Sequence, residues 1–132
     1  MSATYDVIFI DDEASLTDIF QQYVIWKYKD WNFMTFNNSQ TAFNAIVDNR
    51  VSAKVWIVDM MMPQKNGADI AQAIRTQGGQ GPVILAYTAL DRRALESNET
   101  YRMGMPHFNH IINKREDFSS ILSLVEVWVK PN

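Results

Sequence analysis

Two hydrophobic patterns alternate along this chain. The first is a short apolar run that ends at polar or turn-forming residues, which is typical of a strand in a parallel sheet. This pattern predicts strands at residues 7–10, 32–36, 55–59, 82–87 and 108–113. The segment 32–36 is the most polar of them, so we expect it at an edge of the sheet.

The second pattern places apolar residues three and four positions apart, as on one face of an amphipathic helix. It predicts helices at about 14–28, 39–49, 70–78, 91–103 and 118–129. Ser39 is the expected N-cap of the second helix, and Gly78-Gly79 should end the third. The helix at 91–103 carries only a thin apolar stripe, so we expect it to be loosely held.

Strands that alternate with helices predict an α/β fold with a doubly wound parallel sheet and right-handed crossovers. We expect the flavodoxin-like (βα)5 arrangement, with five strands in the order 2-1-3-4-5. A length of 132 residues, 47% of them hydrophobic, is enough for one well-packed domain and too short for a second, so residues 1–132 are expected to form a single domain.

Composition narrows the possible functions. The net charge of −3 argues against a nucleic acid as the direct partner, and the absence of cysteine excludes disulfides, thiolate metal sites and thiol nucleophiles. The N-terminal residues do not resemble a signal peptide, and no apolar stretch approaches membrane-spanning length. We therefore expect a cytoplasmic protein with no membrane partner.

Acidic residues end two of the predicted strands. Asp11 and Asp12 follow the first strand, and Asp59 closes the third. In the expected strand order these ends flank the point where the crossovers diverge, which is where open α/β sheets bind ligands. Carboxylates this close repel one another unless a cation lies between them, and Mg²⁺ fits an all-oxygen site that also contacts a phosphoryl group.

The same edge of the sheet should carry Thr88 and Lys114, which follow the fourth and fifth strands. An ionised Asp59 can attack phosphorus without a general base, because a carboxylate needs no deprotonation. The lysine, the threonine hydroxyl and loop N–H groups can stabilise the charge on the phosphoryl oxygens. The product would be an aspartyl phosphate.

These residues give the chain its family resemblance. Asp11-Asp12-Glu13, Asp59-x-x-Met62-Pro63-x-x-x-Gly67, Thr88-Ala89 and Lys114 occur in this order at the expected strand ends. Over its whole length the chain resembles a receiver domain of the two-component response regulators. The resemblance implies a phosphoacceptor switch with Mg²⁺ as cofactor, and not a turnover enzyme.

The resemblance also implies individual roles at the metal site. Asp59 matches the phosphoacceptor, and Asp12 and Asp59 match the carboxylate ligands of Mg²⁺. The backbone carbonyl of Met61 matches the third protein ligand, and Asp11 would hold the water shell of the metal.

Other residues match the phosphoryl-binding part of the family site. Thr88 and the Ala89 N–H would bind phosphoryl oxygens, and Lys114 would pair with the phosphate. The implied donor is a sensor histidine kinase or a histidine phosphotransfer protein. Phosphorylation would change the binding of an effector through the face formed by the fourth helix, fifth strand and fifth helix, which is also a possible homodimer surface.

Three features depart from the family pattern. Arg115 follows the site lysine where the family usually has proline, so we expect a trans peptide bond there. Ile111 stands where the family usually has an aromatic residue that reports phosphorylation. Met61 and Leu90 are apolar at positions that could orient a hydrolytic water, which predicts slow loss of the phosphoryl group.

Three alternatives remain open at this point. An aspartate-nucleophile phosphatase of the haloacid dehalogenase type would use the same ion, but its Asp-x-Asp signature is absent. A flavodoxin-like FMN carrier would need a phosphate-binding first loop, whereas Asp11-Asp12-Glu13 would repel phosphate. The third alternative is a receiver fold that works only by protein contact, which the Arg115 and Ile111 departures leave possible.

Overall fold

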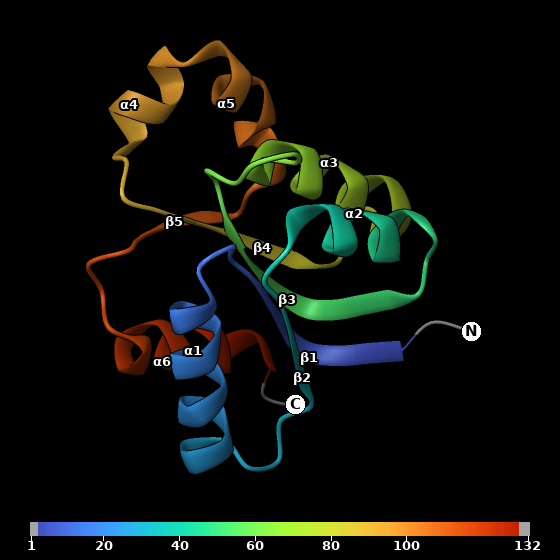
Figure 1. Cartoon of the computed structure of the whole chain (residues 1–132), viewed down its shortest axis with the longest axis vertical. Coiled ribbons are helices and arrows are strands. Elements are labelled where there is room, and N and C mark those ends of the chain that lie inside the picture. Colours follow the sequence, from blue (N-terminus) through green and yellow to red (C-terminus); the bar gives the residue numbers. More distant parts are fainter. Residues whose placement is uncertain (1–2, 130–132) are drawn as a thin grey trace.

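A five-stranded parallel sheet lies between two layers of helices in the computed structural model, which describes residues 3–129 (Figure 1). The strand order is β2-β1-β3-β4-β5, so the predicted flavodoxin-like topology is confirmed. The strands are β1 (Ala3–Ile10), β2 (Phe33–Phe36), β3 (Val51–Asp59), β4 (Val83–Thr88) and β5 (His110–Asn113). The helices are α1 (Ala14–Lys27), α2 (Ser39–Val47), α3 (Gly67–Gly78), α4 (Arg92–Ser97), α5 (Glu99–Gly104) and α6 (Phe118–Val129), with a short 3-10 turn η1 (Met105–His107) before β5.

Alternate residues of the central strands face two separate cores. Val55 and Ile57 of β3 pack in the core that includes α1 and α6, whereas Trp56 and Val58 pack in the core that includes α2 and α3. All four side chains are buried. Burial on both faces explains why this strand is apolar at every one of these positions instead of at every second one.

Strands β1 and β3 begin earlier than their apolar runs predict. Ala3 pairs with Val51 and Thr4 with Ser52, so the ladder extends into a polar stretch. Lys54 and Asp6 form an ion pair at 3.4 Å in this region. Backbone hydrogen bonds to the neighbouring strand keep these residues extended although they lack a hydrophobic pattern. The sequence of one segment does not show which strand it will pair with, so this extension was not predicted.

The segment 91–103 does not form the single continuous helix that the sequence predicts, so this prediction is wrong. The segment forms two short helices, because the backbone of Asn98 is extended and its side chain accepts hydrogen bonds from the N–H groups of Thr100 and Tyr101. Asn98 therefore starts a second helix where the apolar stripe suggested one continuous helix. Leu95 is the buried residue of α4.

The predicted N-cap of the second helix is also wrong. Asn38 caps α2 by accepting a hydrogen bond from the N–H of Thr41, and Ser39 is the first helical residue. The Ser39 side chain is buried, and its hydroxyl donates to the carbonyl of Pro63 and accepts from the N–H of Lys65 at 3.1 Å. Ser39 thus attaches α2 to the loop that follows Asp59.

Within residues 3–129, none of the helices combines the length and the apolar character that a membrane crossing requires.

Candidate functional site

The register of the sheet places Asp11 beside Asp59. Ile10 pairs with Val58 across β1 and β3, so the residues that follow them leave the sheet side by side. Both carboxylates are buried, at 0% and 2% exposure. The two acidic strand ends that the sequence predicts to converge therefore do so.

Asp12 completes the acidic cluster from the solvent side. One carboxylate oxygen from each of Asp11, Asp12 and Asp59 lies within 4.8 Å of the others. Asp12 itself is exposed, whereas its two neighbours are buried. The cluster is thus open to solvent on one side, where a cation or a phosphoryl group can approach.

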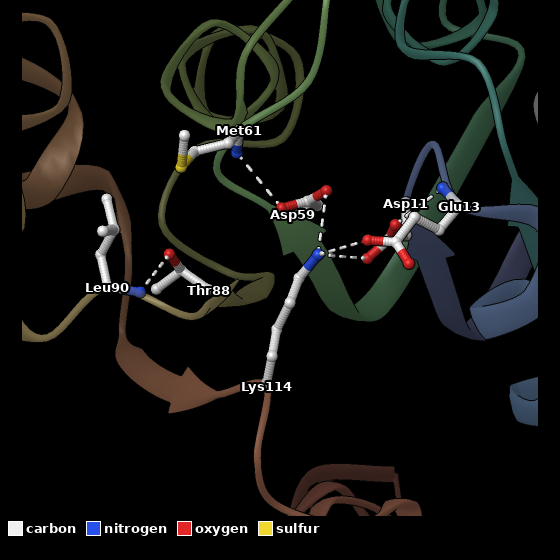
Figure 2. Close-up of polar contacts among 7 residues, drawn as sticks. All are labelled: Asp11, Glu13, Asp59, Met61, Thr88, Leu90 and Lys114. Atoms are coloured by element: carbon white, nitrogen blue, oxygen red, sulfur yellow. Dashed lines mark hydrogen bonds and ion pairs between the residues drawn. The ribbon is translucent and has the colours of Figure 1, made fainter.

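Lys114 extends from the end of β5 to this cluster (Figure 2). Its Nζ atom is 3.1 Å from Oδ2 of Asp11 and 3.3 Å from Oδ2 of Asp59. It also lies 3.8 Å from Oε1 of Glu13, and 5.3 Å from the centre of the Tyr87 ring. The ammonium therefore offsets part of the negative charge of the cluster in a largely buried position.

Strand pairing explains how Lys114 arrives there. Thr88 at the end of β4 pairs with Asn113 at the end of β5. The carbonyl of Thr88 then accepts a hydrogen bond from the N–H of Lys114 at 3.0 Å. This bond fixes the backbone of the lysine at the strand end, so its side chain is directed along the edge of the sheet towards β3 and β1.

Thr88 lies on the opposite side of Lys114 from Asp11 in Figure 2. Its side chain is buried, and its Oγ1 accepts a hydrogen bond from the N–H of Leu90 at 3.0 Å. Ala89, which the sequence also assigns to the site, is exposed at the end of the strand. The threonine hydroxyl is thus near the cluster but is engaged with its own turn.

The loop after Asp59 packs tightly against the strand end. Met61 donates its N–H to Oδ1 of Asp59 at 3.2 Å, and Gly67 donates its N–H to the carbonyl of Met60 at 3.0 Å. A Cβ atom on Gly67 would lie 2.7 Å from the Asp59 carbonyl oxygen and 2.8 Å from the Met60 Cα. Glycine is required here because the start of α3 presses directly against the backbone of the site.

Burial is the largest influence on the pKa of each of the two buried carboxyl groups, Asp11 and Asp59. It raises the pKa of Asp59 to about 7, with a further rise caused by the neighbouring Asp11 and an opposing effect from Lys114. Burial likewise raises the pKa of Asp11. Although burial alone favours the neutral amine, the charges of Asp59 and Asp11 raise the pKa of Lys114, which stays protonated.

The oxygen donors fit a hard divalent cation. Oδ2 of Asp11 and Oδ2 of Asp59 are buried, and the Lys114 ammonium lies 3.1 Å and 3.3 Å from them. Buried carboxylate oxygens are costly unless cations compensate them, and one ammonium carries only a single positive charge. The Asp11, Asp12 and Asp59 carboxylates with the single Lys114 ammonium leave a charge that a divalent ion would neutralise, and carboxylate oxygens are the ligands that Mg²⁺ prefers.

Sequence reasoning assigned no role to two residues that shape this site. Glu13 belongs to the acidic run, yet its contact with Lys114 depends on where the lysine side chain lies. Tyr87 is buried beneath the lysine and pairs with Asp59 across β3 and β4. Its place directly before Thr88 in an apolar strand gives no sign that it borders the site.

The two departures near Lys114 have clear structural outcomes. The Lys114–Arg115 peptide bond is trans, as predicted, and cis bonds are absent from residues 3–129. Ile111 is half-buried against a small cluster of buried residues, Met60, Ala86 and Leu95, beneath α4 and α5. An aliphatic side chain at this position thus packs against the adjacent core.

Comparison with known families agrees with this geometry. The model of the response regulator receiver domain matches residues 7–126. The chain belongs to the response regulator receiver domain family. The matched segment includes every residue of the acidic cluster, as well as Thr88 and Lys114.

Curated relatives match part of the chain. The transcriptional regulatory protein CpxR of Escherichia coli K12 is 29% identical over 79 residues, which cover 60% of this chain and 32% of that protein. The transcriptional regulatory protein CssR of Bacillus subtilis 168 is 25% identical over 81 residues, covering 61% of this chain and 34% of the relative. The aligned part thus spans about a third of these longer proteins.

Solved structures share the fold over nearly the whole receiver domain. The receiver domain of the sensor histidine kinase PA1611 from Pseudomonas aeruginosa PAO1, which has a magnesium ion coordinated in its active-site cleft, superposes with a TM-score of 0.74 at 14% identity and covers 98% of this chain and 100% of its own. The receiver domain of the Francisella response regulator 1452 gives 0.73 at 18%, covering 96% and 97%. The chemotaxis protein CheY4 of Vibrio cholerae gives 0.69 at 21%, covering 96% and 99%.

Proposed function

We propose that this receiver domain, formed by the chain as one unit, accepts a phosphoryl group on Asp59 in a Mg²⁺-dependent reaction. The observation that supports this most directly is the convergence of three carboxylates and Lys114 at the carboxyl ends of β1, β3 and β5. Asp59 is the central carboxylate of this arrangement. A receiver domain in the cytoplasm would obtain the group from a sensor histidine kinase or a histidine phosphotransfer protein.

The proposed transfer is a substitution at phosphorus. A carboxylate oxygen of Asp59 forms the new P–O bond while the P–N bond to the donor imidazole breaks, and the imidazole keeps the electron pair and takes a proton from water. Lys114 would move from Asp59 Oδ2, now 3.3 Å from its Nζ, to a phosphoryl oxygen. Thr88 Oγ1, freed from Leu90, and the Ala89 N–H would contact the remaining oxygens.

The proposed metal ligands rest on the acidic cluster and on the family resemblance. Asp12 and Asp59 would bind Mg²⁺ directly together with the Met61 carbonyl, and Asp11 would orient its waters. When bound, Mg²⁺ lowers the repulsion between the carboxylates and the incoming phosphoryl oxygens. The Met61 N–H, which donates to Oδ1 of Asp59, holds the carboxylate so that its other oxygen faces the cluster.

The output of the switch would lie in the segment after Thr88. Helix α4 is six residues long and has Leu95 as its buried residue, and Asn98 separates it from α5. A change at Thr88 is transmitted directly to this weakly anchored segment, since Leu90 is bonded to the Thr88 hydroxyl. We therefore assign effector binding, and possible homodimer formation, to the face of α4, α5, β5 and α6.

Phosphorylation by a small donor tests this proposal. Purified protein incubated with radiolabelled acetyl phosphate and Mg²⁺ should incorporate an acid-labile phosphoryl group and gain the mass of one phosphate. Asp59→Asn should abolish the labelling, whereas Asp30→Asn, a matched change at an exposed residue away from the site, should retain it. Undiminished labelling of the Asp59→Asn variant, or no labelling of the parent protein, would refute the proposal.

A further inference from the structure

The loop between Asp59 and α3 contains a strained turn at Gln64. The backbone of Gln64 has a φ of 69°, a positive value that residues other than glycine rarely adopt. The N–H of Lys65 donates a hydrogen bond to the carbonyl of Pro63 at 2.8 Å, so the turn closes over only three residues. A three-residue turn with a positive φ at its centre is the rare and strained form of the γ-turn. It persists only where surrounding groups hold it.

A buried hydroxyl on α2 holds this turn. Ser39 is 2% exposed, and its hydroxyl donates a hydrogen bond to the carbonyl of Pro63 at 2.5 Å and accepts one from the N–H of Lys65 at 3.1 Å. One hydroxyl thus bridges both ends of the turn. Phe43, one helical turn further along α2, adds a second contact, since the Lys65 ammonium lies 4.3 Å from the centre of its ring. The side chain of Gln64 is exposed, so its own burial does not stabilise the turn.

The same loop contacts the phosphoryl site at its other end. Met61 donates its N–H to Oδ1 of Asp59 at 3.2 Å, as Figure 2 shows. Met62 is the one residue between Met61 and Pro63, and its side chain is buried in the core that includes α2 and α3. The backbone of Met61 is therefore held between the Asp59 carboxylate on one side and the strained turn on the other.

We propose that Ser39 is a positioning residue for the Mg²⁺ site and acts through the turn at Gln64. By bridging the ends of the turn, its hydroxyl fixes the course of the loop and with it the direction of the Met61 carbonyl. This inference rests on the proposed function, in which that carbonyl is a Mg²⁺ ligand. Ser39 acts through Met61 and needs no contact with the ion.

The Mg²⁺ affinity of unphosphorylated protein, measured by calorimetric titration, tests this role. Ser39→Ala removes the hydroxyl and should raise the Kd for Mg²⁺ by about tenfold, the lower end of the range for residues that orient metal ligands. Ser123→Ala, at an exposed residue of α6, is the matched control and should leave the Kd unchanged. An unchanged Kd in folded Ser39→Ala protein would overturn the proposal.

A second variant of α2 separates positioning from a general loosening of the helix. Ile46 is a buried residue of α2 outside the loop contact, and Ile46→Val should lower the stability of the protein without changing its Kd for Mg²⁺. If Ile46→Val weakened Mg²⁺ binding as much as Ser39→Ala does, loss of helix packing would explain both results. The specific role of the Ser39 hydroxyl would then be excluded.

Relief of the strain at position 64 should rescue the Ser39→Ala variant. Glycine adopts a positive φ without steric cost, so adding Gln64→Gly should bring the Kd back to within about threefold of the parent value. Gln64→Ala in the same background keeps a Cβ atom and should give no rescue. Failure of the glycine rescue, or an equal rescue by alanine, would show that the turn is not the link between Ser39 and the ion.

Hydrogen exchange in EDTA examines the turn without metal. The Lys65 amide should exchange about tenfold faster in Ser39→Ala than in the parent protein, as expected for the loss of one hydrogen bond. Equal exchange rates would contradict the proposal.

The proposed function fails by a different result. Parent protein that binds Mg²⁺ but is not labelled by acetyl phosphate would refute phosphoryl transfer and leave the role of Ser39 standing. Parent protein that binds no Mg²⁺ would overturn both.

Discussion

Asp59 ends β3 and Lys114 follows β5, and β4 lies between these strands, yet the lysine Nζ lies 3.3 Å from Oδ2 of the aspartate. The same Nζ is 3.1 Å from Oδ2 of Asp11. The lysine therefore occupies the oxygens that a divalent cation and a phosphoryl group would use. Its ammonium compensates the buried carboxylates, and in the proposed reaction it would move to the phosphate.

This arrangement predicts opposite effects of Lys114→Gln on metal binding and on phosphorylation. Without the competing ammonium, the carboxylates should bind Mg²⁺ at least as tightly as in the parent protein. The rate of labelling by acetyl phosphate at saturating Mg²⁺ should fall by about 10²–10³-fold. This is the usual effect of removing one hydrogen-bond donor that stabilises the negative charge developing in a transition state. Calorimetric titration with Mg²⁺ and labelling rates measure the two effects. A variant that lost Mg²⁺ affinity but kept its labelling rate would contradict this assignment.

The buried carboxylate at position 59 predicts a pH-dependent stability of metal-free protein. The pKa of Asp59 is raised to about 7 in the folded protein, from a value of 3.8 when the group is fully hydrated. The folded state thus binds the proton more tightly, so the stability from this group is complete below about pH 4 and is lost as the pH rises through 7. In EDTA, the free energy of unfolding should fall between about pH 5 and pH 8.

Asp59→Asn provides the control for this pH dependence. The amide cannot ionise, so the variant should be more stable than the parent protein at pH 8 and should show a smaller fall from pH 5. Added Mg²⁺ should stabilise the parent protein at pH 8 more than it stabilises the variant. Urea denaturation at each pH measures these values. Equal pH slopes for the two proteins would show that another group is responsible.

Gly67 should be sensitive to the smallest possible change. Gly67→Ala places a Cβ 2.7 Å from the Asp59 carbonyl oxygen, so the start of α3 and the loop before it must move apart. We expect a loss of about 1–3 kcal/mol in the free energy of unfolding, together with weaker Mg²⁺ binding. Gly81→Ala is the matched control, because its nearest neighbour would be 4.0 Å away. The prediction fails if the two substitutions have the same effect on urea denaturation.

Gly104 and Ala68 should be energetically coupled. A Cβ on Gly104 would lie 3.0 Å from the Cα of Ala68 and closer still to its Cβ, so α5 approaches α3 only because residue 104 has no side chain. Gly104→Ala should destabilise the protein by about 1–3 kcal/mol. Adding Ala68→Gly should restore part of the loss, with a coupling energy of at least about 0.5 kcal/mol in a double-mutant cycle. If the effects of Gly104→Ala and Ala68→Gly on the free energy of unfolding were strictly additive, the two positions would not be coupled, and this prediction would be wrong.

The phosphorylated protein should lose its phosphoryl group slowly. Met61 is 55% exposed beside Asp59, and Leu90 is half-buried beside Thr88, so neither side chain can orient an attacking water. Loss of label after removal of the donor should take minutes or longer. Met61→Asn should accelerate the loss, whereas Met103→Asn, at a methionine that is 71% exposed on α5, should not. A parent half-life of seconds would refute this expectation.

The sequence by itself determined the strands, most helices and the chemical character of the site. Apolar runs and helical periodicity report which residues must be buried, and in a parallel sheet burial and crossover rules largely decide the topology. The residues that end those runs, Asp11, Asp59, Thr88 and Lys114, must then share one edge. Their convergence could be predicted because strand direction alone brings these ends together.

Only the tertiary structure decided which partners several polar side chains contact. Ser39 bonds the Pro63–Lys65 loop although its sequence position suits a helix cap. The break at Asn98 is different, because it depends on a local cap of α5 that hydrophobic periodicity does not report. Lys114 contacts Glu13 only because its backbone is held by Thr88. Periodicity reports burial but does not identify the partner of a polar group, because that partner comes from another part of the chain.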